Sequence, residues 1–131
     1  MDDAAKSNRP EEWVRPEVIP EAVPAATVVL ARDAVDGAGG IEVLLARRNS
    51  KIHFAGGAWV FPGGRIDPDD HRGVAIESAF DEDDPAFVDV ARNACVREAE
   101  EEAGAHIDAA GLVMLSHWTP PIEAPKRFST W

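Results

Sequence analysis

The stretch that decides the fold is Arg97-Glu-Ala-Glu-Glu-Glu-Ala-Gly104. Glu98, Glu101 and Glu102 are spaced i, i+3 and i+4, so a helix places their carboxylates on one face. Like charges at this spacing repel each other, which lowers stability unless a cation lies between them. Mg²⁺ takes carboxylate oxygens together with substrate phosphates, so the octapeptide is a candidate metal site. A solvated, Glu-rich helix surface is the alternative for the octapeptide alone.

The helix that carries this octapeptide has both a start and an end signal. Asp84 can cap it, Pro85 suits its first position, and Gly104 suits its C-terminal exit. At about 100° per residue, one face of the helix is apolar and is expected to pack on a sheet. The residues of that face are Val88, Ala91, Cys95 and Ala99.

A short strand and a double-glycine turn precede the helix. Residues 58–61 form the predicted strand, and Pro62-Gly63-Gly64 ends it in a tight turn. Because glycine lets a backbone approach a metal or a phosphate closely, Gly64 is a candidate to complete the ion site. Pro-Gly-Gly alone could be an ordinary turn, but such a turn before a well-capped, acid-faced helix is less often accidental.

Further strands are predicted on either side of this core. Residues 26–31 and 41–46 are apolar runs joined by the turn-rich segment 32–40. We expect them to form an antiparallel hairpin that is covered on both faces. A later strand is expected at 112–116, and the chain ends at Trp131 in what resembles the start of another strand.

The length of the chain and its distribution of prolines indicate how it is divided into domains. Residues 1–23 are expected to be a poorly ordered arm, because prolines recur there without a sustained hydrophobic period. Residues 24–131 then form one domain, since 131 residues suffice for one domain and not for two. Cys95 and the four histidines show no metal-ligand spacing, and Trp59 and Trp118 are expected to lie in the core.

The charge of the chain argues against several partners. Asp and Glu number 24 against 13 Lys and Arg, which gives a formal net charge of -11. Such a surface repels a phosphate backbone, so no nucleic acid is expected as a partner. No run approaches the roughly 20 apolar residues of a membrane span, so no membrane association is expected. The acidic N-terminus and the single cysteine lead us to expect a cytoplasmic location.

The chain resembles the Nudix hydrolase family at both ends of that family's sequence box. The start of the box matches Gly64, and its second half, Arg-Glu-apolar-x-Glu-Glu-x-Gly-apolar, matches residues 97–105. The resemblance covers roughly residues 23–131 and implies an α+β fold, a Nudix-like α/β/α sandwich with a mixed sheet. The family fold normally continues with further strands and a covering helix, so we expect this chain to lack the C-terminal elements.

The resemblance leaves one acidic position of the box open. Counting five residues onward from Gly64 leads to Asp70, whereas counting back from Arg97 leads to Asp89. Between Asp70 and Arg97 lie 26 residues, where the family has seven. The difference indicates an insertion of 19 residues, placed at about 71–88, which is expected to form a lobe near the site.

A box split in this way resembles the coenzyme A diphosphatase branch of the family. The segment upstream of the box loosely matches that branch's signature, with Arg48 at its arginine and Gly56 at a glycine. Gly57 stands where the signature has a glutamate, so the match is partial. The segment 125–128 is also similar to that branch. The implied substrate is coenzyme A or an acyl-coenzyme A.

The resemblance implies a metal-dependent hydrolase that cleaves a diphosphate bond in a nucleoside diphosphate derivative, a small phosphorylated partner. Mg²⁺ or Mn²⁺ would bridge the diphosphate and lower the pKa of an attacking water. The implied metal ligands are Glu98, Glu101, Glu102 and Gly64.

The resemblance also implies roles for other residues. Glu98 is the candidate proton acceptor, Arg97 would orient a carboxylate, and the substrate-binding candidates are Arg48, Lys51, Phe61 and Gly63. For Arg48 and Lys51 a solvated surface is the alternative. An uncovered sheet edge also leads us to expect a homo-oligomer. The alternative function is a non-catalytic module that binds a nucleotide or coenzyme A, although a pure binder has no need of three converging carboxylates.

Overall fold

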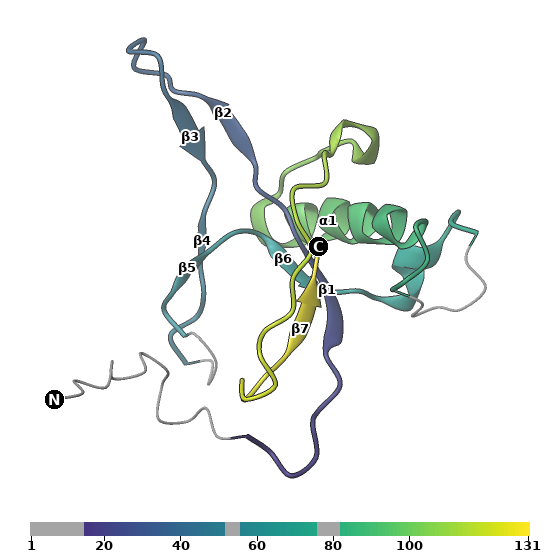
Figure 1. Ribbon diagram of the computed structural model, residues 1–131. Helices are drawn as coiled ribbons and strands as arrows, with labels where there is room; N and C mark the ends of the chain where they lie inside the picture. The colour runs from purple at the N-terminus through teal and green to yellow at the C-terminus, as the bar shows by residue number, and fades with distance from the viewer. Residues whose placement is uncertain (1–14, 52–55, 76–81) are drawn as a thin grey trace, which may run out of the picture.

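The computed structural model describes residues 15–51, 56–75 and 82–131. One long helix crosses a small central sheet, and a hairpin projects away from both (Figure 1). The strands are β1 (Val23–Thr27), β2 (Ala31–Asp33), β3 (Ile41–Val43), β4 (Ala46–Arg47), β5 (Trp59–Val60), β6 (Gly63–Arg65) and β7 (Phe128–Thr130). The helices are the 3-10 helix η1 (Pro68–His71), the α-helix α1 (Phe87–Ala103) and the 3-10 helix η2 (Ala109–Gly111).

The central sheet has the strand order β6-β1-β7. Strand β1 pairs antiparallel with β6, where Ala26 lies opposite Gly64, and parallel with β7, where Ala25 lies opposite Thr130. The predicted mixed sheet and α+β class are therefore confirmed, and so is a strand at the end of the chain. Within the described ranges α1 is the single α-helix. These ranges therefore contain one of the two helical layers of the expected α/β/α sandwich.

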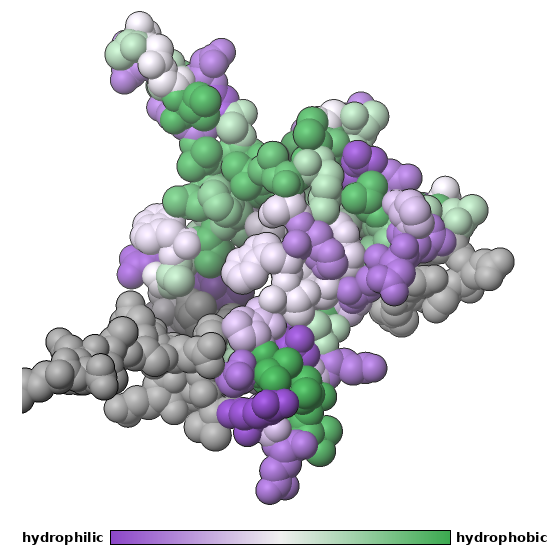
Figure 2. All heavy atoms as spheres, in the orientation of Figure 1, coloured by the Kyte–Doolittle hydropathy of each residue, from purple (hydrophilic) through white to green (hydrophobic). Residues whose placement is uncertain are grey.

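A hairpin forms in this region, but its bounds differ from those predicted and it is more exposed than expected. The end of β1, which belongs to the central sheet, takes the start of the strand predicted at 26–31, and β2 extends into the predicted turn 32–40. Strand β2 pairs with β3 in antiparallel register, and β4 pairs separately with β5. Ile41 is 77% exposed and Val43 is 47% exposed, so the expectation of strands covered on both faces is wrong. The physical reason is that this hairpin extends beyond the single helix, which leaves its apolar atoms at the surface (Figure 2).

Helix α1 begins at Phe87, slightly later than predicted. The Asp84 side chain accepts a hydrogen bond from the Ala86 amide at 2.9 Å, so Asp84 stabilises the turn before the helix. At the other end Gly104 adopts a left-handed conformation with φ 61°, as predicted for the exit. No helix in the described part of the chain is both long and apolar enough to cross a bilayer.

The core lies between α1 and the central sheet and is built largely from alanine. Ala94 and Ala99 on the helix and Ala26 on β1 are fully buried, and small side chains of this kind let the helix approach the sheet closely. Of the predicted apolar face, Ala91, Cys95 and Ala99 are buried, whereas Val88 is only half-buried. The largest buried residue is Phe87, whose ring lies 4.7 Å from that of Trp131.

The strand predicted at 112–116 does not form, and this prediction is wrong. The segment follows η2 as an extended chain, and Val113 and Leu115 are 80% and 78% exposed. Both edges of β1 are taken by β6 and β7, and the segment pairs with neither of these outer strands. A single bridge between Trp118 and Thr130 is the pairing that this region makes with β7.

Replacing the core aromatic tests this arrangement. Phe87→Ala is expected to lower the free energy of unfolding by about 3–5 kcal/mol, because it removes a fully buried ring and leaves a cavity. Urea denaturation followed by circular dichroism measures this change. Val113→Ala is the control, and at an exposed position it is expected to shift stability by less than about 0.5 kcal/mol. Equal effects of the two substitutions would contradict the placement of the core.

Candidate functional site

The Gly63-Gly64 segment and the acidic helix meet at one point of the structure. The tight turn predicted at Pro62-Gly63-Gly64 is wrong, because both glycines lie in strand β6 and pair with β1. Strand β6 carries Gly63 and Gly64 past α1, where the Glu98 side chain reaches them. A Cβ atom at Gly64 would overlap the carboxylate of Glu98. A side chain at position 64 would therefore force the Glu98 carboxylate to move, and Glu98 as a residue is only 9% exposed.

The other two glutamates of the helix lie beside this contact. The Gly63 amide donates a hydrogen bond of 3.1 Å to Oε2 of Glu102, and Oε2 of Glu101 lies 3.3 Å from Nη1 of Arg97. Across residues 15–51, 56–75 and 82–131, no group of three or more acidic, histidine or cysteine side chains converges in a way that could hold a metal ion. The carboxylates of Glu101 and Glu102 do not converge because each accepts a hydrogen bond from a different donor, Arg97 and the Gly63 amide respectively.

Glu98 carries an electrostatic cost in this setting. Burial raises the pKa of the Glu98 carboxyl above its usual range, and the charges of Glu102 and Glu101 raise it further. The hydrogen bond and the charge of Arg97 act in the opposite direction and lower this pKa. A cation placed beside Glu98 would favour its ionised form, because a positive charge offsets both the burial of the carboxylate and the repulsion from Glu101 and Glu102.

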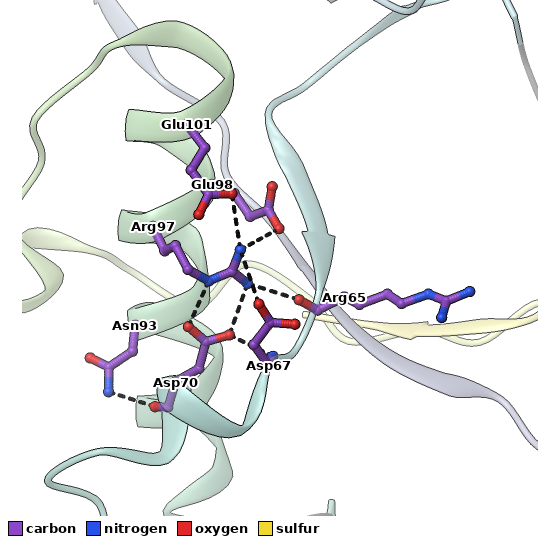
Figure 3. A network of polar contacts seen from close by, with 7 residues as sticks. All are labelled: Arg65, Asp67, Asp70, Asn93, Arg97, Glu98 and Glu101. Atoms are coloured by element: carbon purple, nitrogen blue, oxygen red, sulfur yellow. Dashed lines mark hydrogen bonds and ion pairs between the residues drawn. The ribbon is translucent and has the colours of Figure 1, made fainter. Parts of the chain in front are cut away.

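Arg97 is the centre of the polar network around Glu98 (Figure 3). Its Nε and Nη2 donate to the two carboxylate oxygens of Asp70 at 3.0 and 2.9 Å, which is a bidentate pair. Nη2 also donates to the carbonyl of Arg65 at 2.9 Å, and Nη1 donates to Oε1 of Glu98 at 2.8 Å. The pKa of Arg97 is raised, chiefly by the hydrogen bond with Asp70. One guanidinium thus joins η1, β6 and α1.

The network shows which acid pairs with Arg97. Asp70 is 3% exposed, and its second oxygen also accepts a hydrogen bond of 2.7 Å from the Asp67 amide. Asp89 instead forms an ion pair of 2.7 Å with Arg92, where its side chain is 57% exposed. Of the two candidate acids, Asp70 is therefore the one that contacts Arg97. Sequence spacing alone left the two counts open because η1 and α1 are joined by a long segment.

An open cleft of about 870 Å³ lies beside Gly63 and Gly64 of β6. Five residues singled out from the sequence line it, whereas Lys51 and the carboxylates of Glu98 and Glu101 do not. The five are Arg48, Phe61, Gly63, Gly64 and Glu102. The cleft is also lined by residues to which the sequence analysis gave no binding role, which are Arg47, Trp59, Arg65, Lys126 and Phe128.

The arginines of the cleft have no acidic partner among the described residues, as is also true of Arg15 and Arg127 outside it. Among the described residues, Arg47, Arg48 and Arg65 form no ion pair with a carboxylate, whereas Arg32, Arg72, Arg92 and Arg97 each form at least one. The Nε atom of Arg48 is buried and also lacks a hydrogen-bond partner within the described ranges. In a chain with a net charge of -11, unpaired cations at one cleft favour an anionic ligand.

Removing the acid that holds Arg97 is expected to destabilise the fold. Asp70→Ala leaves a largely buried guanidinium without its bidentate partner, which should lower the free energy of unfolding by roughly 3 kcal/mol. The matched control is Asp89→Ala, which breaks an exposed pair and should change stability by at most about 1 kcal/mol. Urea denaturation of both variants is the measurement. A smaller loss for Asp70→Ala than for Asp89→Ala would contradict the central role of this network.

Comparisons with known proteins agree with this geometry. The model of the family described as NUDIX domain matches residues 21–130, which include Gly63 and Gly64, the Asp70–Arg97 pair and all of α1. Among solved structures, the crystal structure of NUDIX hydrolase from Alicyclobacillus acidocaldarius is similar, with a TM-score of 0.61 and 26% sequence identity. The match covers 86% of this chain and 68% of that chain. No curated protein matches the chain significantly. Since the family model spans most of its length, the chain belongs to the NUDIX domain family.

Proposed function

We propose that this chain hydrolyses a diphosphate bond in a nucleoside diphosphate derivative with the help of divalent metal ions. The observation that carries the proposal is the buried Glu98 carboxylate against Gly64, beside Glu102 at the border of the arginine-lined cleft. Membership of the NUDIX domain family and the likeness to a solved NUDIX hydrolase support a pyrophosphatase. The unpaired arginines support a substrate that carries phosphates.

The residues present fit a divalent ion. Glu98, Glu101 and Glu102 would hold Mg²⁺ or Mn²⁺, with Gly64 as the proposed backbone ligand. Oxygen ligands are those that Mg²⁺ prefers, and burial raises the pKa of Glu98 even though Arg97 lowers it, so a further cation would favour the ionised carboxylate. Glu101 and Glu102 would exchange their hydrogen bonds with Arg97 and the Gly63 amide for contacts with the ion. A bound ion supplies charge neutralisation and lowers the pKa of a water molecule.

The chain's own residues would divide the remaining work. Arg97, held by Asp70, fixes the orientation of Glu98. Glu98 is the proposed proton acceptor, because a carboxylate with a raised pKa is a better base near neutral pH. Arg48 and the Gly63 backbone at the cleft are proposed to contact the substrate's phosphates, since binding and orientation are the main contributions of protein groups to phosphoryl transfer.

We further propose that the substrate is coenzyme A or an acyl-coenzyme A. Two features support this choice. Arg48, which stands at the arginine of the coenzyme A diphosphatase signature, lines the cleft. The segment between Asp70 and Arg97 has the length expected of a box split by an insertion. The products would be 3′,5′-adenosine diphosphate and a phosphopantetheine species.

Product chromatography tests the activity and the substrate together. Incubation with coenzyme A and Mg²⁺ or Mn²⁺ is expected to release 3′,5′-adenosine diphosphate. Glu98→Gln should reduce kcat by more than about 100-fold, since even partners outside the first ligand shell contribute about 10- to 100-fold. Glu100→Gln is the matched control: this glutamate lies on the same helix, directed towards His106, and its loss should leave kcat unchanged.

The outcomes of this assay separate the alternatives. Cleavage of ADP-ribose but not of coenzyme A would keep the hydrolase and reject the coenzyme A assignment. Metal and nucleotide binding without turnover of either substrate would instead support a non-catalytic binding module. A Glu98→Gln variant with full activity would contradict the assigned role of this carboxylate.

The metal-free protein offers a test through its pH dependence. Folding raises the pKa of Glu98, so its contribution to stability is fully present below the unfolded pKa of about 4.3 and is lost as the pH rises through the folded value. Without metal, Glu98→Gln should therefore have a higher Tm than the wild type at pH 7, and the difference should vanish below about pH 4. Mg²⁺ should raise the Tm of the wild type but not of the variant. Calorimetry measures both, and equal Mg²⁺ shifts would contradict Glu98 as a ligand.

A further inference from the structure

Trp59 is the most unusual residue of the cleft because it is large, aromatic and 65% exposed. We expected it in the core from the sequence, and that expectation is wrong. It lies on the short strand β5, where its cross-strand neighbour is Arg47 of β4. Side chains directly opposite in an antiparallel pair share a face, so the two residues form one surface. Keeping an indole in solvent sacrifices apolar burial, which favours a binding role for it.

Arg47 gives this indole a charged partner. Its guanidinium carbon lies 5.9 Å from the centroid of the Trp59 ring, which is a cation–π contact. The same guanidinium has no carboxylate partner among the described residues, so its charge remains available to a ligand. A planar aromatic ring beside an unpaired arginine is the combination that stacks on nucleobases and contacts their phosphates.

The cleft places this aromatic surface together with the diphosphate end of the site. Its lining runs from Arg47 and Trp59 on the β4–β5 pair to Gly63, Gly64 and Glu102 near the carboxylates. Its volume of about 870 Å³ lies within the range of about 300–1,000 Å³ that is common for small-molecule sites. A ligand with an aromatic base at one end and a diphosphate at the other matches both parts of this lining.

We propose that Trp59, with Arg47 beside it, is the platform on which the base of a nucleotide substrate stacks. The base is then selected on the β4–β5 pair, and the diphosphate is held beside Gly63 and Gly64 of β6. This assignment rests on the proposed function for the choice of a nucleotide as ligand. It adds a specificity-determining residue that acts in binding and takes no part in the bond cleavage.

A pair of non-hydrolysable probes tests the platform. Isothermal titration calorimetry with Mg²⁺ would compare α,β-methylene adenosine diphosphate with methylenediphosphonate, which has the same phosphorus groups but no nucleoside. Trp59→Ala should weaken binding of the nucleotide by roughly 5- to 150-fold, the range for one stacked base, and leave binding of methylenediphosphonate unchanged. Trp59→Phe should retain most of the affinity, because it keeps an aromatic face.

Trp118→Ala is the matched control. Trp118 is 67% exposed, similar to Trp59, but it does not line this cleft. Its substitution should leave the affinity for both probes unchanged. Unchanged nucleotide affinity in Trp59→Ala would overturn the platform, and so would an equal loss for both probes. Failure of the wild type to bind the nucleotide probe would overturn it as well.

The binding result is distinguishable from failure of the proposed activity. Nucleotide binding that depends on Trp59, together with no hydrolysis of coenzyme A or ADP-ribose, would support the platform and refute the hydrolase. Hydrolysis of these compounds, together with nucleotide affinity that is unchanged in Trp59→Ala, would support the hydrolase and refute the platform.

Discussion

The bidentate pair between Arg97 and Asp70 is the constraint on which the site depends. Asp70 is buried, and the guanidinium that it binds also reaches the Arg65 carbonyl and the Glu98 carboxylate. The neighbouring segments β6 and η1 are thereby fixed to α1, which is distant in sequence, around a single cation (Figure 3). A bidentate arginine–carboxylate pair restricts direction as well as distance, so it also sets the orientation of Glu98.

Small residues make this arrangement sterically possible. Ala94 and Ala99 bring α1 close to the sheet, and Gly64 leaves room for a carboxylate between helix and strand. The close approach buries Glu98 beside two other acids, and its pKa rises in consequence. The same features that hold the site together therefore leave it short of positive charge, and a bound cation would relieve this shortage.

The protein separates its charges in space. The chain is strongly acidic overall, yet the cleft next to the carboxylates keeps Arg47, Arg48 and Arg65 without acidic partners among the described residues. Carboxylates on one side and arginines on the other suit a ligand whose phosphates are shared between a cation and the protein. The exposed indole of Trp59 extends this cleft with an aromatic surface. These contacts are local, so the net charge of the chain did not reveal them.

The features that sequence alone determined are those that depend on neighbours along the chain. The spacing of Glu98, Glu101 and Glu102 and the helix exit at Gly104 follow from helix periodicity and backbone freedom, which a short segment fixes by itself. Tertiary structure decided the rest. The choice of Asp70 over Asp89 depends on where η1 meets α1, and the exposure of Trp59 depends on the layers around β5. The strand expected at 112–116 also depends on tertiary structure, since a strand requires a pairing partner and neither outer strand of the β6-β1-β7 sheet pairs with this segment.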